Sequence, residues 1–243
     1  MDIQLAIICF LTFVIHLMGT LAYSVRIAGV RTRRVAMSFA LFNILVLVSR
    51  TSNGFQVPFM NKRVEQSAGN PHLLADFRWF LFSATLATLV GAVLIPTFQR
   101  LFSQALLKFQ THRSVPRLLL QSVCGGGFAS LRESISLPAS ANVRQLRNRS
   151  SVSPQVISLN VVAMALWTVG VFAPAYAGFL DPALRLTSGG LSSLINGLAT
   201  ILMFIVIDPQ MSVMTDDVVE GKMSESAFRR SIVWLVGGRC AGT

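Results

Sequence analysis

Hydrophobic positions gather into five runs of membrane length, separated by polar and basic stretches. Windows of about 20 apolar residues cross a hydrocarbon core of about 30 Å, and they predict spans at Ile3–Tyr23, Val35–Phe55, Trp79–Phe98, Gln155–Phe179 and Leu186–Ile207. A sixth run, Ile232–Gly238, is too short, because the stretch from Ser231 to Thr243 gives only about 20 Å of helix. We expect that the last helix is partial or that the chain stops before its natural end. The pattern predicts an all-α fold, a polytopic membrane helix bundle of five full spans plus a sixth partial or truncated span.

Composition supports the membrane class. Of 243 residues, 53% are hydrophobic and 13% are charged, and the mean hydropathy is +0.61, which together are typical of an integral membrane protein. The first span follows Asp2 rather than a basic segment, so we expect it to be retained and not cleaved as a signal peptide. We treat 1–243 as a single transmembrane domain with a basic cytoplasmic linker at 99–154.

Basic side chains set the expected orientation. Four arginines follow the first span, namely Arg26, Arg31, Arg33 and Arg34, and this excess places the first loop in the cytoplasm and the amino terminus outside. Alternating spans then put most of the other lysines and arginines in inside loops. The net charge of +11 is therefore explained by attraction to anionic membrane lipids, at about 1 kcal/mol per basic residue, and not by nucleic acid.

Cofactor motifs are not indicated. The cysteines and histidines are scattered, without the spacing of a zinc site or a disulfide framework: Cys9, Cys124, Cys240, His16, His72 and His112. The glycines at 125–127 lack a following Gly-Lys-Ser/Thr, so they predict a hinge rather than a phosphate loop. We expect no cofactor and no direct use of ATP.

Arg50 is the main clue to a site. It follows the apolar run Val35–Val48 and precedes another nearly uncharged stretch. An arginine at such depth costs about 2.5 to 3.5 kcal/mol by insertion scales, and it persists where it faces a bundle interior, a wet cavity or an anionic ligand. The alternative is an arginine that extends to the outer headgroups.

Other polar residues and prolines interrupt the apolar spans. The polar ones are His16, Asn43, Asn160, Asn196 and Asp208, the last at the end of the fifth span. Each is also explained by interhelical hydrogen bonds of about 0.6 to 2 kcal/mol. Four prolines are expected to interrupt or end helices: Pro58, Pro96, Pro174 and Pro209.

The basic linker holds two predicted features. Apolar residues recur with helical spacing just after the third span, at Leu101, Phe102, Ala105, Leu106 and Phe109. They fit either an amphipathic helix on the inner interface or an extension of the third span. The Ser-, Asn- and Arg-rich tract Ser134–Ser153 is predicted to be a mobile linker.

The two halves of the chain share spacings. Asn43 precedes Phe77 by 34 residues, and Asn196 precedes Phe228 by 32. Three spans per half would invert the second half relative to the first, which is a common plan among transporters. We therefore predict a 3+3 inverted repeat with the substrate at the repeat interface.

Three stretches of sequence resemble one known family. Leu11–Thr32 and Ser38–Asn53 closely resemble the opening of the Amj family of bacterial lipid II flippases. Gly221–Glu225, with the Phe-Arg-Arg and Trp-Leu-Val-Gly motifs that follow it, resembles the stretch before that family's last membrane helix. Family members usually continue past the residue at which this chain stops, which favours a truncated last span.

The resemblance implies a transporter rather than an enzyme. Its substrate would be lipid II, an undecaprenyl pyrophosphate that carries a sugar-pentapeptide, moved from the inner to the outer leaflet of the bacterial cell membrane for peptidoglycan synthesis. Arginine suits this cargo because its planar fork binds phosphate through two hydrogen bonds and stays charged.

The family resemblance suggests a role for each candidate residue. Arg26, Arg31, Arg33 and Arg34 would attract the pyrophosphate at the inner face, Arg50 would hold it in the cavity, and Lys62, Arg63 or Arg78 would receive it outside. His16, Asn43 and Asn196 are candidates for sugar or peptide hydrogen bonds. Asp208 and Glu65 would pair with arginines when the site is empty.

Two other function classes stay open at this point. A membrane enzyme acting on a prenyl phosphate would need clustered acidic residues in its metal-dependent forms, and only Asp216 with Asp217 comes close. A noncatalytic membrane scaffold would use the buried polar residues for packing alone.

Overall fold

A computed structural model describes residues 2–66, 73–112, 134–136 and 152–243. Within these residues the secondary structure is helical: α1 (Ile3–Thr32), α2 (Val35–Gln66), α3 (Leu73–His112), α7 (Pro154–Leu180), the 3-10 turn η2 (Pro182–Leu184), α8 (Arg185–Leu202), the π-helical turn η3 (Met203–Ile207), α9 (Asp208–Val219) and α10 (Glu225–Gly242). Five segments are long and apolar enough to cross a membrane: α1, α2, α3 up to Lys108, α7, and the run Pro182–Val219. The predicted all-helical bundle with five full spans and a shorter sixth helix is confirmed.

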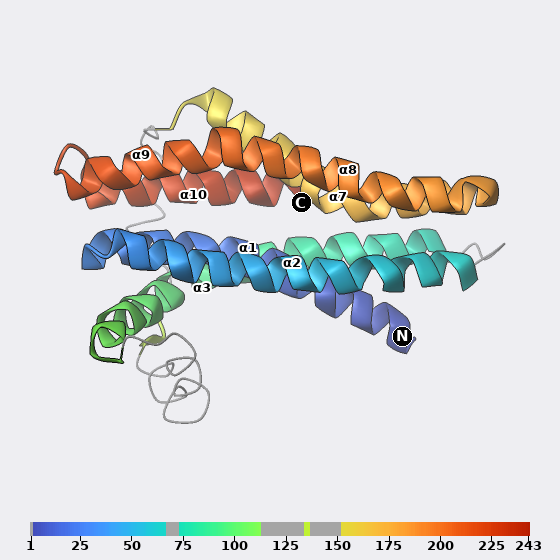
Figure 1. Ribbon diagram of the computed structural model, residues 1–243, viewed down its shortest axis with the longest axis horizontal. Helices are drawn as coiled ribbons and strands as arrows, with labels where there is room; N and C mark the ends of the chain where they lie inside the picture. The colour runs from blue at the N-terminus through green and yellow to red at the C-terminus, as the bar shows by residue number, and fades with distance from the viewer. Residues whose placement is uncertain (1, 67–72, 113–133, 137–151) are drawn as a thin grey trace.

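The helices form two layers (Figure 1). One layer holds α1, α2 and α3, and the other holds α7, α8, α9 and α10. We call these layers the amino-terminal half and the carboxyl-terminal half. Successive spans run in opposite directions along the long axis, with α8, η3 and α9 forming one span, so α7 runs opposite to α1 (Figure 1). This arrangement fits an inverted relation between the halves, while the sequence repeat itself stays a prediction.

Polar contacts hold α1 against its neighbours. Gln56 Nε2 of α2 donates to Thr12 Oγ1 at 2.6 Å, and Ser83 Oγ of α3 donates to the Cys9 carbonyl at 2.7 Å. In the other half, Asn160 of α7 is fully buried, and its Nδ2 donates to the Leu235 carbonyl of α10 at 2.7 Å. Such bonds contribute about 0.6 to 2 kcal/mol each between membrane helices. The packing role that we considered for Asn160 is therefore present.

Two apolar clusters join the halves, one at each end of the bundle. The turns between α1 and α2 and between α9 and α10 lie together at one end (Figure 1), which we call the basic end because it carries Arg31, Arg33, Lys222 and Arg229. The basic-end cluster contains Tyr23, Ile27, Val30, Val152, Ile207, Met211, Met214, Phe228, Ile232, Leu235 and Val236. The amino-end cluster, at the opposite end, contains Leu5, Ile8, Met60, Val64, Leu73, Phe77, Phe80, Val171, Phe172 and Ala175.

Several predicted helix ends are wrong. The helices continue through Pro58, Pro96 and Pro174, because neighbouring helices and local adjustments accommodate proline within a membrane bundle. The fifth span does not end at Ile207. Its π-helical turn leads into α9, which continues to Val219. A π-helical turn widens the helix where Pro209 has no N–H to donate and would clash with the carbonyl four residues earlier.

The third span continues into the linker. α3 runs without a break to His112, and its last turns bend away from the rest of the bundle (Figure 1). The apolar positions at 101–106 therefore belong to an extension of the third span, which was one of the two alternatives, and not to a separate helix. The glycine hinge at 125–127 and most of the tract at 134–153 lie outside the described residues.

Candidate functional site

A pocket opens between the two halves, between the basic-end and amino-end clusters. Its cavity volume is about 90 Å³, and it is partly open to the surroundings. Its wall comes from α1, α2, α7, α8, η3, α9 and α10, and it consists of Gly19, Ala22, Tyr23, Arg26, Phe42, Val46, Ser49, Arg50, Met164, Trp167, Thr200, Met203, Phe204, Ile207, Asp208 and Arg239. Three arginines and one aspartate give this mostly apolar pocket a formal charge of 3 − 1 = +2.

A buried ion pair crosses the halves at the side of the pocket nearer the basic end. Arg26 Nη2 of α1 lies 2.5 Å from Asp208 Oδ1 of α9. The side chain of Arg26 is 5% exposed and that of Asp208 is 23% exposed. The Arg26 guanidinium also lies 4.6 Å from the ring centre of Phe42 and 5.4 Å from that of Phe39, both on α2. The expected pairing of Asp208 with an arginine is thus present, and it uses the arginine that we had assigned to the inner face.

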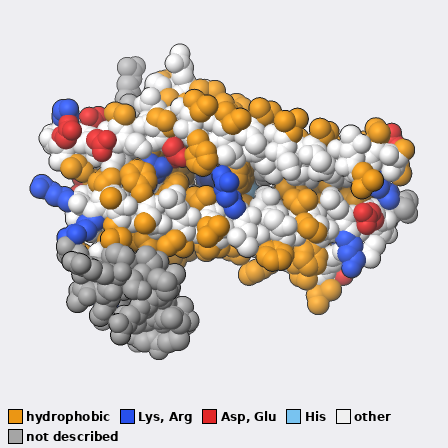
Figure 2. All heavy atoms as spheres, viewed as in Figure 1, with side chains coloured by type: hydrophobic (Ala, Val, Ile, Leu, Met, Phe, Trp, Pro, Cys, Tyr) orange, Lys and Arg blue, Asp and Glu red, His pale blue; other side chains and the backbone are white. Residues whose placement is uncertain are grey.

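Arg50 lies in the middle of α2, within the membrane-spanning segment. The helix has 32 residues, or about 48 Å at 1.5 Å per residue, and Arg50 is about 15 residues from each end. Its side chain is exposed, and its guanidinium lies 5.8 Å from the ring centre of Phe204 in η3. Figure 2 shows basic side chains at mid-length of this face, between the two halves. An arginine at this depth is far from either headgroup layer, which favours the cavity interpretation over an arginine that extends to the outer headgroups.

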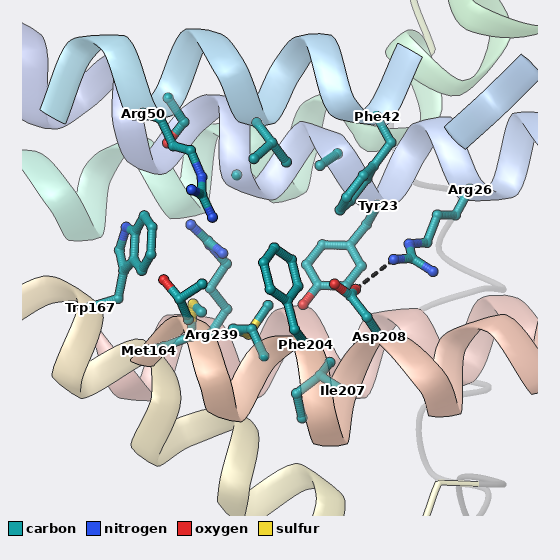
Figure 3. Close-up of a pocket in the computed structure, with 16 residues that line it drawn as sticks. Tyr23, Arg26, Phe42, Arg50, Met164, Trp167, Phe204, Ile207, Asp208 and Arg239 are labelled. Atoms are coloured by element: carbon teal, nitrogen blue, oxygen red, sulfur yellow. Dashed lines mark hydrogen bonds and ion pairs between the residues drawn. The ribbon is translucent and has the colours of Figure 1, made fainter. Parts of the chain in front are cut away.

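Arg239 supplies a third cation that the sequence analysis missed. It follows the short apolar run Ile232–Gly238, and it is 5% exposed and lines the pocket from α10. Figure 3 shows the guanidinium groups of Arg50 and Arg239 pointing into the same space beside Trp167, while the Arg26–Asp208 pair lies beyond Phe204 and Tyr23. The signal that could have found Arg239 was the one used for Arg50, an arginine directly after an apolar run.

Glycine at position 19 lets Arg239 approach α1. A Cβ built there would overlap with Nη2 of Arg239 and lie 2.8 Å from its Cζ. The guanidinium therefore lies close to α1 at a place that a larger residue would occupy. Gly19 is thus part of the pocket wall.

Several pocket donors have no protein partner. Among the described residues, the buried atoms Arg26 Nη1, Tyr23 Oη and Arg239 Nε make no hydrogen bond. Unpaired buried polar groups are rare and costly. Their concentration in one cationic pocket indicates a site for an anionic or polar ligand.

The other candidate residues lie outside this pocket. Arg31 and Arg33 are exposed and Arg34 is half-buried at the α1–α2 turn, while Lys62 and Arg78 are exposed at the opposite end. Asn43 is exposed on α2, whereas His16 is buried in α1. Asn196 Oδ1 packs so closely on Gly170 of α7 that a Cβ there would overlap with it. Of the predicted substrate residues, the structure brings Arg26 and Arg50 together.

Arg63 holds the amino-terminal half together at the end opposite the basic end. Its Nη1 lies 2.8 Å from Asp2 Oδ2, and its Nε lies 2.7 Å from Asp76 Oδ2. The hydrogen bond from Arg63, helped by the Gln4 backbone N–H, lowers the pKa of Asp2 below its usual value of 3.8. Arg63 thus links the start of α1 to α3. Glu65, the other expected partner for an arginine, forms no ion pair within the described residues.

Comparisons with known proteins agree on one family. The family model described as "Amj: Alternate to MurJ" matches residues 11–243. The curated protein "Lipid II flippase Amj" of Bacillus subtilis (strain 168) is 35% identical over 242 residues, which cover 98% of this chain and 89% of that protein. No solved structure matches.

Proposed function

The chain belongs to the Amj family, and on that premise we propose that it is a lipid II flippase, a transporter that moves the undecaprenyl-pyrophosphate-linked peptidoglycan precursor across the bacterial cell membrane. The curated relative carries that activity in its name. The observation on this chain that best supports the proposal is the pocket of formal charge +2 between the halves. Such a charge within membrane-spanning helices is costly, and it persists where it serves an anionic cargo.

The position of the pocket suits a lipid with a polar head. Arg50 is exposed at mid-length of α2, on the face where basic side chains appear between the halves (Figure 2). An opening toward the lipid would let the headgroup enter the pocket while the prenyl tail stays in hydrocarbon. Only the headgroup then has to be shielded from the membrane core during transport.

The pocket volume indicates that the halves move during transport. The cavity between the halves, about 90 Å³, is smaller than the roughly 300 to 1,000 Å³ of pockets that accommodate ordinary small molecules. A complete sugar-pentapeptide needs far more room. We infer that the apolar cluster at each end opens in turn, which gives alternating access to a central site.

The orientation and the end residues form part of the proposal. With the amino terminus outside, the basic end faces the cytoplasm, where Arg31, Arg33 and Arg34 lie close to anionic lipids and attract the pyrophosphate headgroup. Lys62 and Arg78, at the opposite end, are available to receive it. His16, Asn43 and Asn196 do not line the pocket in this conformation. His16 is buried, so its contact with sugar or peptide would require the halves to separate, whereas Asn43 is already exposed.

The enzyme alternative has weaker support. Among the described residues, no group of three or more His, Cys, Asp or Glu side chains could hold a metal ion. The curated relative is instead named a flippase. A scaffold with no transport activity would give no reason for Arg50 and Arg239, two pocket arginines that form no ion pair in the part of the chain that the structure describes.

Complementation tests the proposal directly. Bacteria whose other lipid II flippases can be depleted would express this chain, and lipid II at the outer surface would be measured with an impermeant probe. We expect the wild type to restore growth and surface lipid II, and Arg50→Ala to abolish both at equal protein level. Arg50→Lys should keep part of the activity, because an ammonium cannot form the bidentate fork.

The matched control is Arg100→Ala, since Arg100 is an exposed arginine of α3 that does not line the pocket. It should behave as the wild type. Failure of the wild-type chain to expose lipid II would reject the function, and full activity of Arg50→Ala would reject the role of the pocket.

A further inference from the structure

Arg239 is buried, and within the described residues it forms no ion pair. Its side chain is 5% exposed, and its Nε is fully buried without a hydrogen bond among the described residues. All ion pairs found among the described residues are formed by other side chains. A buried guanidinium that lacks a carboxylate partner is costly and is retained when it faces an anionic ligand.

Arg239 and Arg50 face each other across the pocket. Arg50 comes from α2 in the amino-terminal half, and Arg239 comes from α10 in the carboxyl-terminal half (Figure 3). In the described residues, the one charged or aromatic contact of Arg50 is with the Phe204 ring. Two guanidinium groups that point into one apolar pocket repel each other, and an anion between them would relieve that repulsion.

The third arginine differs because it is already neutralised. Arg26 is paired with Asp208 at 2.5 Å and lies against Phe42. The excess charge of the pocket therefore belongs to Arg50 and Arg239. A pyrophosphate carries a negative charge on each of its two phosphates, so each guanidinium can form its own two-bond fork with one of them. A monophosphate offers oxygens on a single phosphorus, so both guanidinium groups would have to converge on that one group.

We propose that Arg50 and Arg239 form a two-sided clamp that selects pyrophosphate-linked lipids over monophosphate-linked lipids, with one guanidinium from each half of the bundle. The clamp rests on the proposed function and names the part of the cargo that this site recognises. Because the two arginines come from different halves, binding replaces their mutual repulsion by attraction to one ligand. Gly19 is part of the clamp, since it gives the Arg239 guanidinium its place against α1.

Binding of two defined lipids tests the clamp. The full chain would be purified into nanodiscs, and its thermal stabilisation would be titrated with undecaprenyl pyrophosphate and, separately, with undecaprenyl phosphate. We expect the wild type to bind the pyrophosphate at least about tenfold more tightly, the equivalent of one charge-assisted hydrogen bond. Arg50→Gln and Arg239→Gln should each lose the preference, while Arg100→Gln keeps it.

A second variant covers the case in which Arg239→Gln does not fold. Arg239→Lys keeps the charge but not the fork, so a folded Arg239→Lys protein should show a clearly reduced preference. Equal stabilisation of the wild type by the two lipids would overturn the clamp. So would an unchanged preference in a folded Arg239 variant.

A flipping assay on the same preparations separates the clamp from the function. Lipid II flipping by the wild type in proteoliposomes, without any pyrophosphate preference, would reject the clamp and leave the flippase function standing. A clear pyrophosphate preference without lipid II flipping would support the clamp and reject the function.

Discussion

The Arg26–Asp208 pair should act as a latch between the two halves at the basic end. Breaking a buried ion pair by removing one partner costs about 3 to 5 kcal/mol. Here Asp208 is 23% exposed, and Arg26 would keep its contacts with Phe39 and Phe42, which contribute about 0.5 to 2 kcal/mol. We therefore expect Asp208→Asn to lower the free energy of unfolding by about 2 to 4 kcal/mol.

A double-mutant cycle isolates the pair. Arg26→Gln, Asp208→Asn and the double variant would be unfolded reversibly in mixed micelles, and their free energies of unfolding would be compared with that of the wild type. The double variant should lose less than the sum of the single variants, by about 1 to 3 kcal/mol, because it leaves no buried charge unpaired. Strictly additive effects would refute the latch.

Three further predictions concern packing, the pocket and orientation. Asn160→Leu should lower the free energy of unfolding by about 0.6 to 2 kcal/mol, because it removes the hydrogen bond from α7 to the α10 backbone. Gly19→Ala should displace the buried arginine of α10 and reduce pyrophosphate binding, whereas Gly54→Ala, which meets no atom within 4 Å, should bind normally. In a cysteine-free background, an impermeant thiol reagent should label Gln66→Cys on intact cells and Glu220→Cys only after permeabilisation; the reverse pattern would overturn the orientation.

Apolar runs predicted the helical spans well and their ends less well. A run of membrane length predicts a helix because the backbone must satisfy its own hydrogen bonds in hydrocarbon. Hydropathy cannot show where the helix ends, since polar residues continue it through the interface, as from Phe55 to Gln66 in α2. Proline was misleading for a related reason. Helix breakers act strongly in water, but Pro58 and Pro96 lie within helices that packing holds in place.

The site was only partly predictable. Arg50 was found because its charge interrupts a long apolar run, a signal local to the sequence. Arg26 follows its span and therefore resembles a loop arginine, yet α1 continues to Thr32 and the partner of Arg26 lies 182 residues away. Arg239 was missed because the apolar run before it is too short to predict a span. The positions of Arg26 and Arg239 in the pocket depend on contacts between helices that are far apart in the chain. A single sequence does not reveal such contacts.

The polar contacts between the halves are unevenly distributed, which leads to a final prediction. Within the described residues, the ion pair that joins the halves is Arg26–Asp208, near the basic end. The side chain of Gln99 in α3 makes a second contact when its amide oxygen faces the guanidinium groups. In that orientation the oxygen accepts hydrogen bonds from Arg31 of α1 and Arg229 of α10, each at 3.1 Å. The ion pair around Arg63 lies within the amino-terminal half. Opening the basic end therefore breaks these polar contacts and also exposes the apolar side chains of the basic-end cluster.

A pyrophosphate can lower that cost, because it offers Arg26 another anionic partner in place of Asp208. A ligand shifts a conformational equilibrium only by its differential affinity for the two states, and this exchange of partners supplies such a difference. We expect a cysteine at Met211, a fully buried member of the basic-end cluster, to react several-fold faster with a thiol reagent when undecaprenyl pyrophosphate is present. Undecaprenol, which has no anionic headgroup, should leave the rate unchanged. An equal acceleration by both lipids would show that the prenyl tail, and not release of the latch, opens this end.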